Sequence, residues 1–324
     1  MCGISGVVGL KNISELLFEG IRNLEYRGYD SCGVALMNKT HLIIKKDIGG
    51  VEEFYRKHNV LKQKSNIGIA HTRWATHGKV TQNNTHPFTS RNRNFAVVHN
   101  GIISNYRSLR DSLKKEGFKF SSETDTEVIA HLLEKFFKRS QNPEKALIKT
   151  LNLIEGTFAL AFICTYLPDQ IFCAKQESPL MLGIGDEIKF VSSDFNAFID
   201  HTKNAVILDD GEYAILSRDS YVVKSIANED EVAKPITKIE WDSETSKKKG
   251  YPHYMLKEIY EQPQTISNAL DLEPSRLDEV VEMFAEADST YFQFHRSEQS
   301  LFTQTPLTSA FTGCLIENRR NHIF

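Results

Sequence analysis

The chain has 324 residues, of which 40% are hydrophobic and 25% charged, and its formal net charge is −3. This length predicts about two domains with a sizeable core, and the nearly balanced charge argues against nucleic acid or an anionic membrane as partner. The five cysteines form no CxxC pair and no zinc-like spacing with the histidines, so we expect no metal, no cofactor and a reducing cytoplasm. No run approaches the ~18 apolar residues of a membrane span, and the N-terminus lacks the apolar core of a signal peptide.

The predicted elements run in the order strands, helices, strands. Residues 2–10 predict a buried strand, and Ser14 is expected to cap the helix that follows. Further strands are predicted at 31–38, 41–47, 67–73 and 95–103, helices at 104–116, 125–138 and 143–153, and strands again at 157–164, 170–176, 187–192, 205–209 and 212–217. This order indicates sheets covered by helices on their outer faces rather than a regular βαβ alternation.

The composition changes near residue 228. Charged residues dominate as far as Lys249 and Gly250, which is typical of a linker. A helix is predicted to begin near His253 and to extend through Ile266, and a second amphipathic stretch covers 275–287.

Cys2 follows the initiator methionine directly. Removal of Met1 would leave a thiol and a free α-amine on one residue. Because an α-amine titrates near ~7.7–8.0 and a free thiol near ~8.5, the amine can take the thiol proton at neutral pH. The alternative, a small apolar residue that starts a buried strand, would be the better interpretation for Cys2 in isolation.

The segment from His71 to Gly78 places polar and aromatic residues in one loop after a strand. Arg73 offers a planar fork of donors suited to a carboxylate, although an ordinary ion pair would use it equally well. His71 also fits the role of a hydrogen-bonded core histidine. Taken alone, this loop leaves the functional and structural interpretations even.

His99, Asn100 and Gly101 end the apolar strand that begins at Phe95. An Asn amide beside a Gly N–H can supply two donors to a developing oxyanion, but Asn-Gly also makes simple hairpin turns. Farther along, Thr124 and Glu127 have the spacing of a capping box. Asp125 between them would then either complement the helix dipole or bind the ammonium of an amino acid.

Together these segments resemble the class II glutamine amidotransferases, and most closely the glutamine:fructose-6-phosphate aminotransferases. The resemblance spans about residues 1–270. It implies an N-terminal-nucleophile hydrolase fold, a four-layer αββα sandwich of two antiparallel sheets between helix layers. The matching strings are Tyr26 to Ser31, His71 to Gly78, His99 to Ile103, Ser122 to Glu127 and Lys257 to Pro263.

The resemblance implies that glutamine is hydrolysed to glutamate and ammonia through a thioester on Cys2. Arg73, with Thr76 and His77, would bind the α-carboxylate of glutamine, and Asp125 its α-ammonium. Asn100 and Gly101 would form the oxyanion hole. The remaining implied residues have gating or supporting roles: Trp74, Arg27, Tyr29 and His86.

The family continues into two sugar isomerase domains that bind fructose-6-phosphate, and this chain departs from it after Phe292. We therefore expect a glutaminase domain at 1–227, a linker at 228–270, and at 271–324 a truncated or frameshifted start of an isomerase domain; a lineage-specific tail is the alternative for 293–324. Fructose-6-phosphate would be used only if isomerase domains are supplied elsewhere, and both a homodimer and a separate isomerase subunit stay open.

Two rival functions compete with this prediction. One is an amidotransferase that donates ammonia to another acceptor, against which the strings at Arg27 to Asp30 and Trp74 to His77 argue. The other is a non-catalytic fragment that persists as a binding module. Stabilisation by glutamine would separate a competent site from such a fragment.

Overall fold

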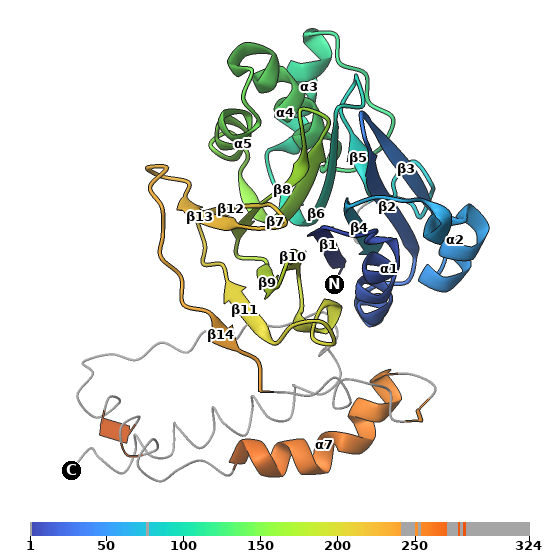
Figure 1. Cartoon of the computed structure of the whole chain (residues 1–324), viewed down its shortest axis with the longest axis vertical. Helices are drawn as coiled ribbons and strands as arrows, with labels where there is room; N and C mark the ends of the chain where they lie inside the picture. Colours follow the sequence, from blue (N-terminus) through green and yellow to red (C-terminus); the bar gives the residue numbers. More distant parts are fainter. Residues whose placement is uncertain are drawn as a thin grey trace, which may run out of the picture. The chain divides into compact units, whose positions relative to one another are not determined.

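Two antiparallel sheets, of eight and six strands, lie at the centre of the fold (Figure 1). The computed structural model describes residues 2–75, 78–240, 250–251, 254–270, 278 and 281–282. The larger sheet has the order β14 (Thr237–Lys238), β11 (Asn204–Ile207), β9 (Met181–Gly185), β10 (Ile188–Ser192), β1 (Gly3–Gly9), β4 (Ile67–Arg73), β2 (Ser31–Asn38), β3 (His41–Ile48). The smaller sheet has the order β13 (Tyr221–Ser225), β12 (Glu212–Leu216), β8 (Leu167–Gln176), β7 (Gly156–Cys164), β6 (Phe95–Ile103), β5 (Phe88–Thr89).

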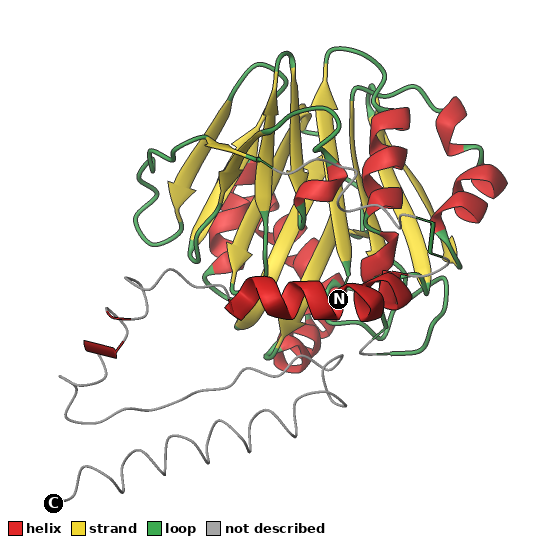
Figure 2. Ribbon diagram, turned by 90° about the horizontal axis from the view of Figure 1, so that it is seen from below, coloured by secondary structure: helices red, strands yellow, loops and turns green. Residues whose placement is uncertain are grey.

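Helices cover the outer face of each sheet. Those on the larger sheet are α1 (Ser14–Asn23) and α2 (Val51–His58), and those on the smaller sheet are α3 (Tyr106–Lys115), α4 (Glu127–Ser140) and α5 (Pro143–Leu151). Figure 1 shows α3, α4 and α5 to one side of the strands and α1 and α2 to the other, and Figure 2 distinguishes the strands from the helices by colour. The arrangement has four layers and confirms the predicted αββα sandwich.

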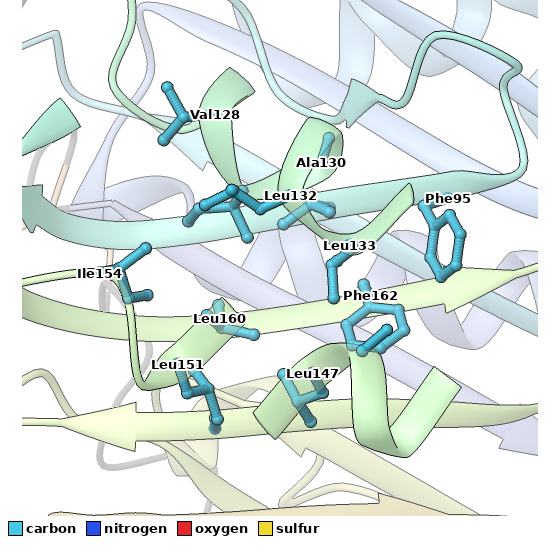
Figure 3. Packing of buried hydrophobic residues seen from close by; sticks show 14 of the residues in the cluster. Phe95, Val128, Ala130, Leu132, Leu133, Leu147, Leu151, Ile154, Leu160 and Phe162 are labelled. Atoms are coloured by element: carbon cyan, nitrogen blue, oxygen red, sulfur yellow. The ribbon is translucent and has the colours of Figure 1, made fainter. Parts of the chain in front are cut away.

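Strand β6 shows how the pattern of residue types builds these layers. Alternate side chains of a strand point to opposite faces. Phe95 and Val97 pack with the helices, whereas Ala96 and Val98 belong to the core between the two sheets. Figure 3 shows the helix-facing side, where residues of α4 and α5 pack over Phe95, Leu160 and Phe162. The small residues therefore face the other sheet and allow the sheets to approach closely.

Most predicted elements recur with small shifts, and three strands match their predicted ends: β2, β4 and β6. The prediction missed α2, β5, β9, β13 and β14. Helix α2 has only eight residues, and β9 contains two glycines, so neither carries a long periodic pattern. The role predicted for Ser14 was wrong: it is the first residue of α1, and its hydroxyl donates to the carbonyl of Gln63 at 2.5 Å.

The chain divides into two compact units, Met1–Tyr254 and Met255–Phe324. Helix α7 (Tyr254–Leu270) agrees with the helix predicted near His253. The predicted domain boundaries remain predictions. Thr237 and Lys238, which belong to the predicted linker, pair with β11 of the larger sheet. Most of the stretch 275–287, and all of 293–324, lies outside the described residues. In the described part of the chain, no helix is long and apolar enough to cross a bilayer.

Candidate active site

Cys2 directly precedes β1, and the register of the strands places it beside the end of β4. In the pairing of β1 with β4, Gly3 lies opposite Thr72, so Cys2 comes next to the residues that follow β4. The backbone N–H of Trp74 donates to Cys2 Sγ at 3.3 Å, and Sγ lies 3.6 Å from the Trp74 carbonyl oxygen. The candidate nucleophile is therefore held by the backbone of the loop predicted to bind substrate.

A second loop, residues 28–30, packs directly against this backbone. A Cβ on Gly28 would lie 2.7 Å from both Arg73 C and Trp74 N, so only glycine fits there. Asp30 fixes the contact, because its N–H donates to the Arg73 carbonyl at 3.0 Å and its Oδ2 accepts from Ala75 N–H at 2.8 Å. Tyr29 meets the Trp74 ring edge-on, with centroids 5.5 Å apart.

The carbonyl oxygen of Cys2 accepts two side-chain hydrogen bonds. Asn100 Nδ2 donates to it at 3.0 Å and Arg27 Nε at 3.3 Å. The Arg27 guanidinium also pairs with Asp194 at 2.9 Å, and Asp194 accepts from the Tyr26 hydroxyl at 2.7 Å. These contacts anchor Cys2 and place Asn100 beside it.

The environment of Cys2 favours a protonated thiol in the resting site. Burial raises the pKa of Cys2, against the hydrogen bond from Trp74 and the positive charges of Arg73 and Arg27, which lower it. A thiol of this kind needs a base before it can attack.

Gly101 has a backbone that other residues cannot adopt. Its φ is +123°, and a Cβ would lie 2.1 Å from the carbonyl oxygen of Thr157. The same stretch of β6 holds Asp125, whose Oδ2 accepts from Ile103 N–H at 2.8 Å. Asn100, Gly101 and Asp125 are thus brought to one end of the smaller sheet.

Arg73 is buried at the end of β4. Its Nη1 donates to the Lys79 carbonyl at 3.3 Å. Burial lowers the pKa of Arg73, while the carboxylates of Asp30 and Asp125, and Cys2 in its thiolate form, act in the opposite direction. The guanidinium therefore lies within electrostatic range of Cys2 and of Asp125. Of the other predicted substrate-binding residues, Thr76 and His77 lie outside the described residues.

Glu127 does not form the capping box that its spacing predicted. Helix α4 begins at Glu127 itself, and Thr126 before it makes no side-chain cap. The Glu127 carboxylate instead accepts from the N–H groups and hydroxyls of Ser121 and Ser122 at 2.7–3.1 Å. It fixes the segment that leads into Asp125.

We expect Glu127→Gln to lower the free energy of unfolding by about 1–3 kcal/mol, because an amide cannot accept as many bonds as the carboxylate it replaces. Burial raises the pKa of Glu127, but hydrogen bonds from His131, Ser122 and Ser121 outweigh it and lower the pKa to about 2. The stabilisation is therefore present above the unfolded-state pKa of ~4.3 and is lost as the pH falls toward 2. Urea unfolding of both proteins between pH 7 and pH 3 measures this. A difference that stays constant with pH would show that the charge is not responsible.

Three buried histidines lie behind Asn100. His71 Nε2 lies 2.9 Å from Asn100 Oδ1, and the His71 ring stacks on His86 with centroids 4.0 Å apart. His86 Nε2 and His99 Nδ1 each lie 3.0 Å from the hydroxyl of Thr126. Burial lowers the pKa of all three histidines, that of His71 to about 3, so all three are neutral near pH 7. In the part of the chain that the structure describes, His86 makes no hydrogen bond with Cys2 and stacks on the His71 ring.

Two site residues escaped the sequence prediction. Asp30 stands inside a matching string but received no role, and Asp194 carries no local signal, since it is 167 residues from Arg27. Among the described residues, no group of three or more His, Cys, Asp or Glu could hold a metal ion. The four cysteines in this part of the chain are all free thiols.

Comparison with known proteins relates the chain to glutamine-dependent enzymes. Residues 71–200 match the model of a glutamine amidotransferase domain. Enzymes named glutamine–fructose-6-phosphate aminotransferase (isomerizing) are similar in sequence to this chain. The one from Thermococcus kodakarensis is 46% identical over 292 residues, which cover 90% of this chain and 48% of the relative. The one from Aquifex aeolicus is 45% identical over 270 residues, 83% of this chain and 45% of the relative. The chain thus spans about half the length of the curated relatives it matches.

Solved structures give the same result for the fold. Glutamine phosphoribosylpyrophosphate amidotransferase from B. subtilis, complexed with ADP and GMP, aligns with a TM-score of 0.60 and 25% identity, covering 69% of this chain and 49% of that one. A structure described as the allosteric regulatory enzyme of purine biosynthesis aligns with a TM-score of 0.60 and 26% identity over the same shares.

Proposed function

The chain belongs to the class II glutamine amidotransferases, and from that premise we propose that it hydrolyses glutamine to glutamate and ammonia with Cys2 as the nucleophile. One observation carries the proposal: Cys2 Sγ is held at the end of β1 by Trp74, while Asn100 Nδ2 lies 3.0 Å from the carbonyl oxygen of the same cysteine. A thiol at the N-terminus and a fixed amide donor beside it suit acyl transfer from an amide.

The proposed chemistry has two steps. After removal of Met1, the α-amine of Cys2 takes the thiol proton, and Sγ attacks the side-chain carbonyl carbon of glutamine. The oxygen of the tetrahedral intermediate accepts hydrogen bonds from Asn100 Nδ2 and the N–H of Gly101. The amine returns the proton to the leaving nitrogen, which departs as ammonia. Water then attacks the thioester, releases glutamate and restores the thiol.

Substrate binding is proposed to rest on a pair of opposite charges. Arg73 would bind the α-carboxylate of glutamine, assisted by Thr76 and His77, and Asp125 would bind the α-ammonium. The electrostatic proximity of Arg73 and Asp125 supports this, since both groups of one amino acid must be reached together. Trp74, Tyr29 and Arg27 are proposed to cover and support this site, and His86 to support it from behind Asn100.

We expect Asp125→Asn to raise the KM for glutamine about tenfold or more with a smaller change in kcat, because it removes the charge opposite the α-ammonium while keeping one acceptor for Ile103. Steady-state kinetics with glutamine test this. An unchanged KM would show that Asp125 only accepts the hydrogen bond from Ile103 in β6. The matched control is Asp111→Asn on α3, which should leave both kcat and KM unaffected.

Amination of fructose-6-phosphate is part of the proposal only where isomerase domains are supplied elsewhere, in a homodimer or by a separate subunit. A cytoplasmic location is proposed with it, because the mechanism needs a free thiol on Cys2 and a reducing compartment keeps thiols free. The decisive assay incubates the purified 324-residue chain with glutamine, with and without fructose-6-phosphate. We expect glutamate and ammonia in both, no amino sugar, and no stimulation by the sugar phosphate. Absence of ammonia release would refute the proposed glutaminase. Amino sugar formed at a rate comparable with glutamine hydrolysis would refute the proposal that amination needs isomerase domains supplied elsewhere.

A further inference from the structure

His71 is buried and makes one side-chain contact that bears on the reaction. Its Nε2 lies 2.9 Å from Asn100 Oδ1, and its Nδ1 has no hydrogen-bond partner among the described residues. An amide oxygen only accepts, so the proton of the neutral imidazole must be on Nε2. His71 therefore donates to Asn100, and the tautomer follows from the contact itself.

The orientation of the Asn100 amide follows from the contacts at its two ends. A carboxamide can turn by 180° and exchange its oxygen and nitrogen. Here the Cys2 carbonyl oxygen, which can only accept, requires N–H at one end, and this leaves the amide oxygen at the end that faces His71 Nε2. The N–H₂ group carries two hydrogens. One is used by the Cys2 carbonyl oxygen, and the second is available to an oxyanion on the nucleophile.

The His71 ring is itself fixed from behind. It lies between Asn100 and the ring of His86, on which it stacks at 4.0 Å. His86 is held by the hydroxyl of Thr126 at the start of α4. This hydroxyl also lies 3.0 Å from His99 Nδ1, one residue before Asn100. These contacts connect the start of helix α4 to the side-chain amide of Asn100 through buried side chains. Because these side chains are neutral, they do not compete with Asn100 for the oxyanion.

We propose that His71 is a positioning residue for glutamine hydrolysis, whose Nε2–H holds the Asn100 amide with its N–H₂ group toward Cys2. This inference rests on the proposed function of the site. His71 does not touch the reacting atoms; it acts through Asn100. Without it, the amide loses the donor at its oxygen end and can leave the orientation that serves the transition state.

Kinetics of two His71 variants test the role. We expect His71→Phe, which keeps an aromatic ring against His86, to lower kcat about 10- to 100-fold, somewhat less than removal of an oxyanion donor, with KM within about threefold. His71→Gln, whose side-chain N–H₂ can replace Nε2–H, is expected to stay within about fivefold of the wild-type kcat. His58→Phe is the matched control, because His58 Nε2 also contacts a side-chain oxygen at 2.9 Å, that of Asp47, outside the site.

A double-mutant cycle separates positioning from a general structural effect. In an Asn100→Ala background, His71→Phe should lower kcat by less than about twofold, since the group it positions is gone. An equal loss in both backgrounds, or a full kcat in His71→Phe alone, would overturn the inference.

A readout without glutamine distinguishes this inference from the proposed function. In protein labelled with ¹⁵N-asparagine, the Asn100 side-chain amide is identified as the signal that is missing in Asn100→Ala. We expect it to shift and to lose its protection from exchange in His71→Phe, and to keep both in His58→Phe. An unchanged signal would contradict the positioning role. If the wild-type chain releases no ammonia but the Asn100 signal still shifts in His71→Phe, only the proposed glutaminase is refuted.

Discussion

Cys2→Ala is expected to lower glutamine hydrolysis by roughly 10⁴-fold or more, because every proposed bond-making step uses Sγ. The fold should survive, since the Cys2 carbonyl still accepts from Asn100 and Arg27 and only the contacts of Sγ with Trp74 are lost. Ammonia release and thermal unfolding, measured on the same preparation, check both expectations.

Two further variants sharpen this test. Cys2→Ser should retain little activity, because a hydroxyl is a far weaker nucleophile near neutral pH. Cys173→Ala removes a thiol that is buried in the core between the sheets, and it should cost stability but not turnover. Intact mass adds an independent requirement, since an active sample that fully retains Met1 would have no free α-amine on Cys2 and would exclude the proposed base.

Asn100→Ala is expected to lower kcat by roughly 10²–10³-fold with only a modest change in KM, because an oxyanion donor acts mainly in the transition state. The structure adds a second reason for a loss: Asn100 Nδ2 also donates to the carbonyl oxygen of Cys2, the proposed nucleophile, at 3.0 Å. Steady-state kinetics with glutamine give the split between kcat and KM.

The matched control for this variant is Asn94→Ala. Asn94 directly precedes Phe95, the first residue of β6, and its side-chain amide donates to the Tyr166 hydroxyl at 2.8 Å. The Asn94→Ala variant therefore loses a comparable hydrogen bond at the end of the strand away from the site. It should leave kcat unchanged. A rise in KM without a fall in kcat in Asn100→Ala would instead show that Asn100 binds the ground state of the substrate.

The sequence alone determined much of the architecture and the kinds of residue that the site contains. The apolar stretch 95–103 predicted the strand that is β6, and the order of strands and helices indicated covered sheets, because such patterns are local. The resemblance of several short strings added the nucleophile at Cys2 and the pair Asn100 and Gly101. Their roles stay predictions until the variants are measured.

Tertiary structure alone decided which of these residues meet. Asn100 reaches Cys2 across 98 positions, Trp74 across 72, and the support of Arg27 by Asp194 spans 167, distances at which no local periodicity carries information. The same limit explains the incorrect capping box, since Glu127 satisfies its carboxylate with Ser121 and Ser122 instead of Thr124. It also explains His71, for which the sequence left the functional and structural interpretations even. The proposed role of His71 depends on one hydrogen bond between strands of different sheets, and only the packing of the sheets creates that contact.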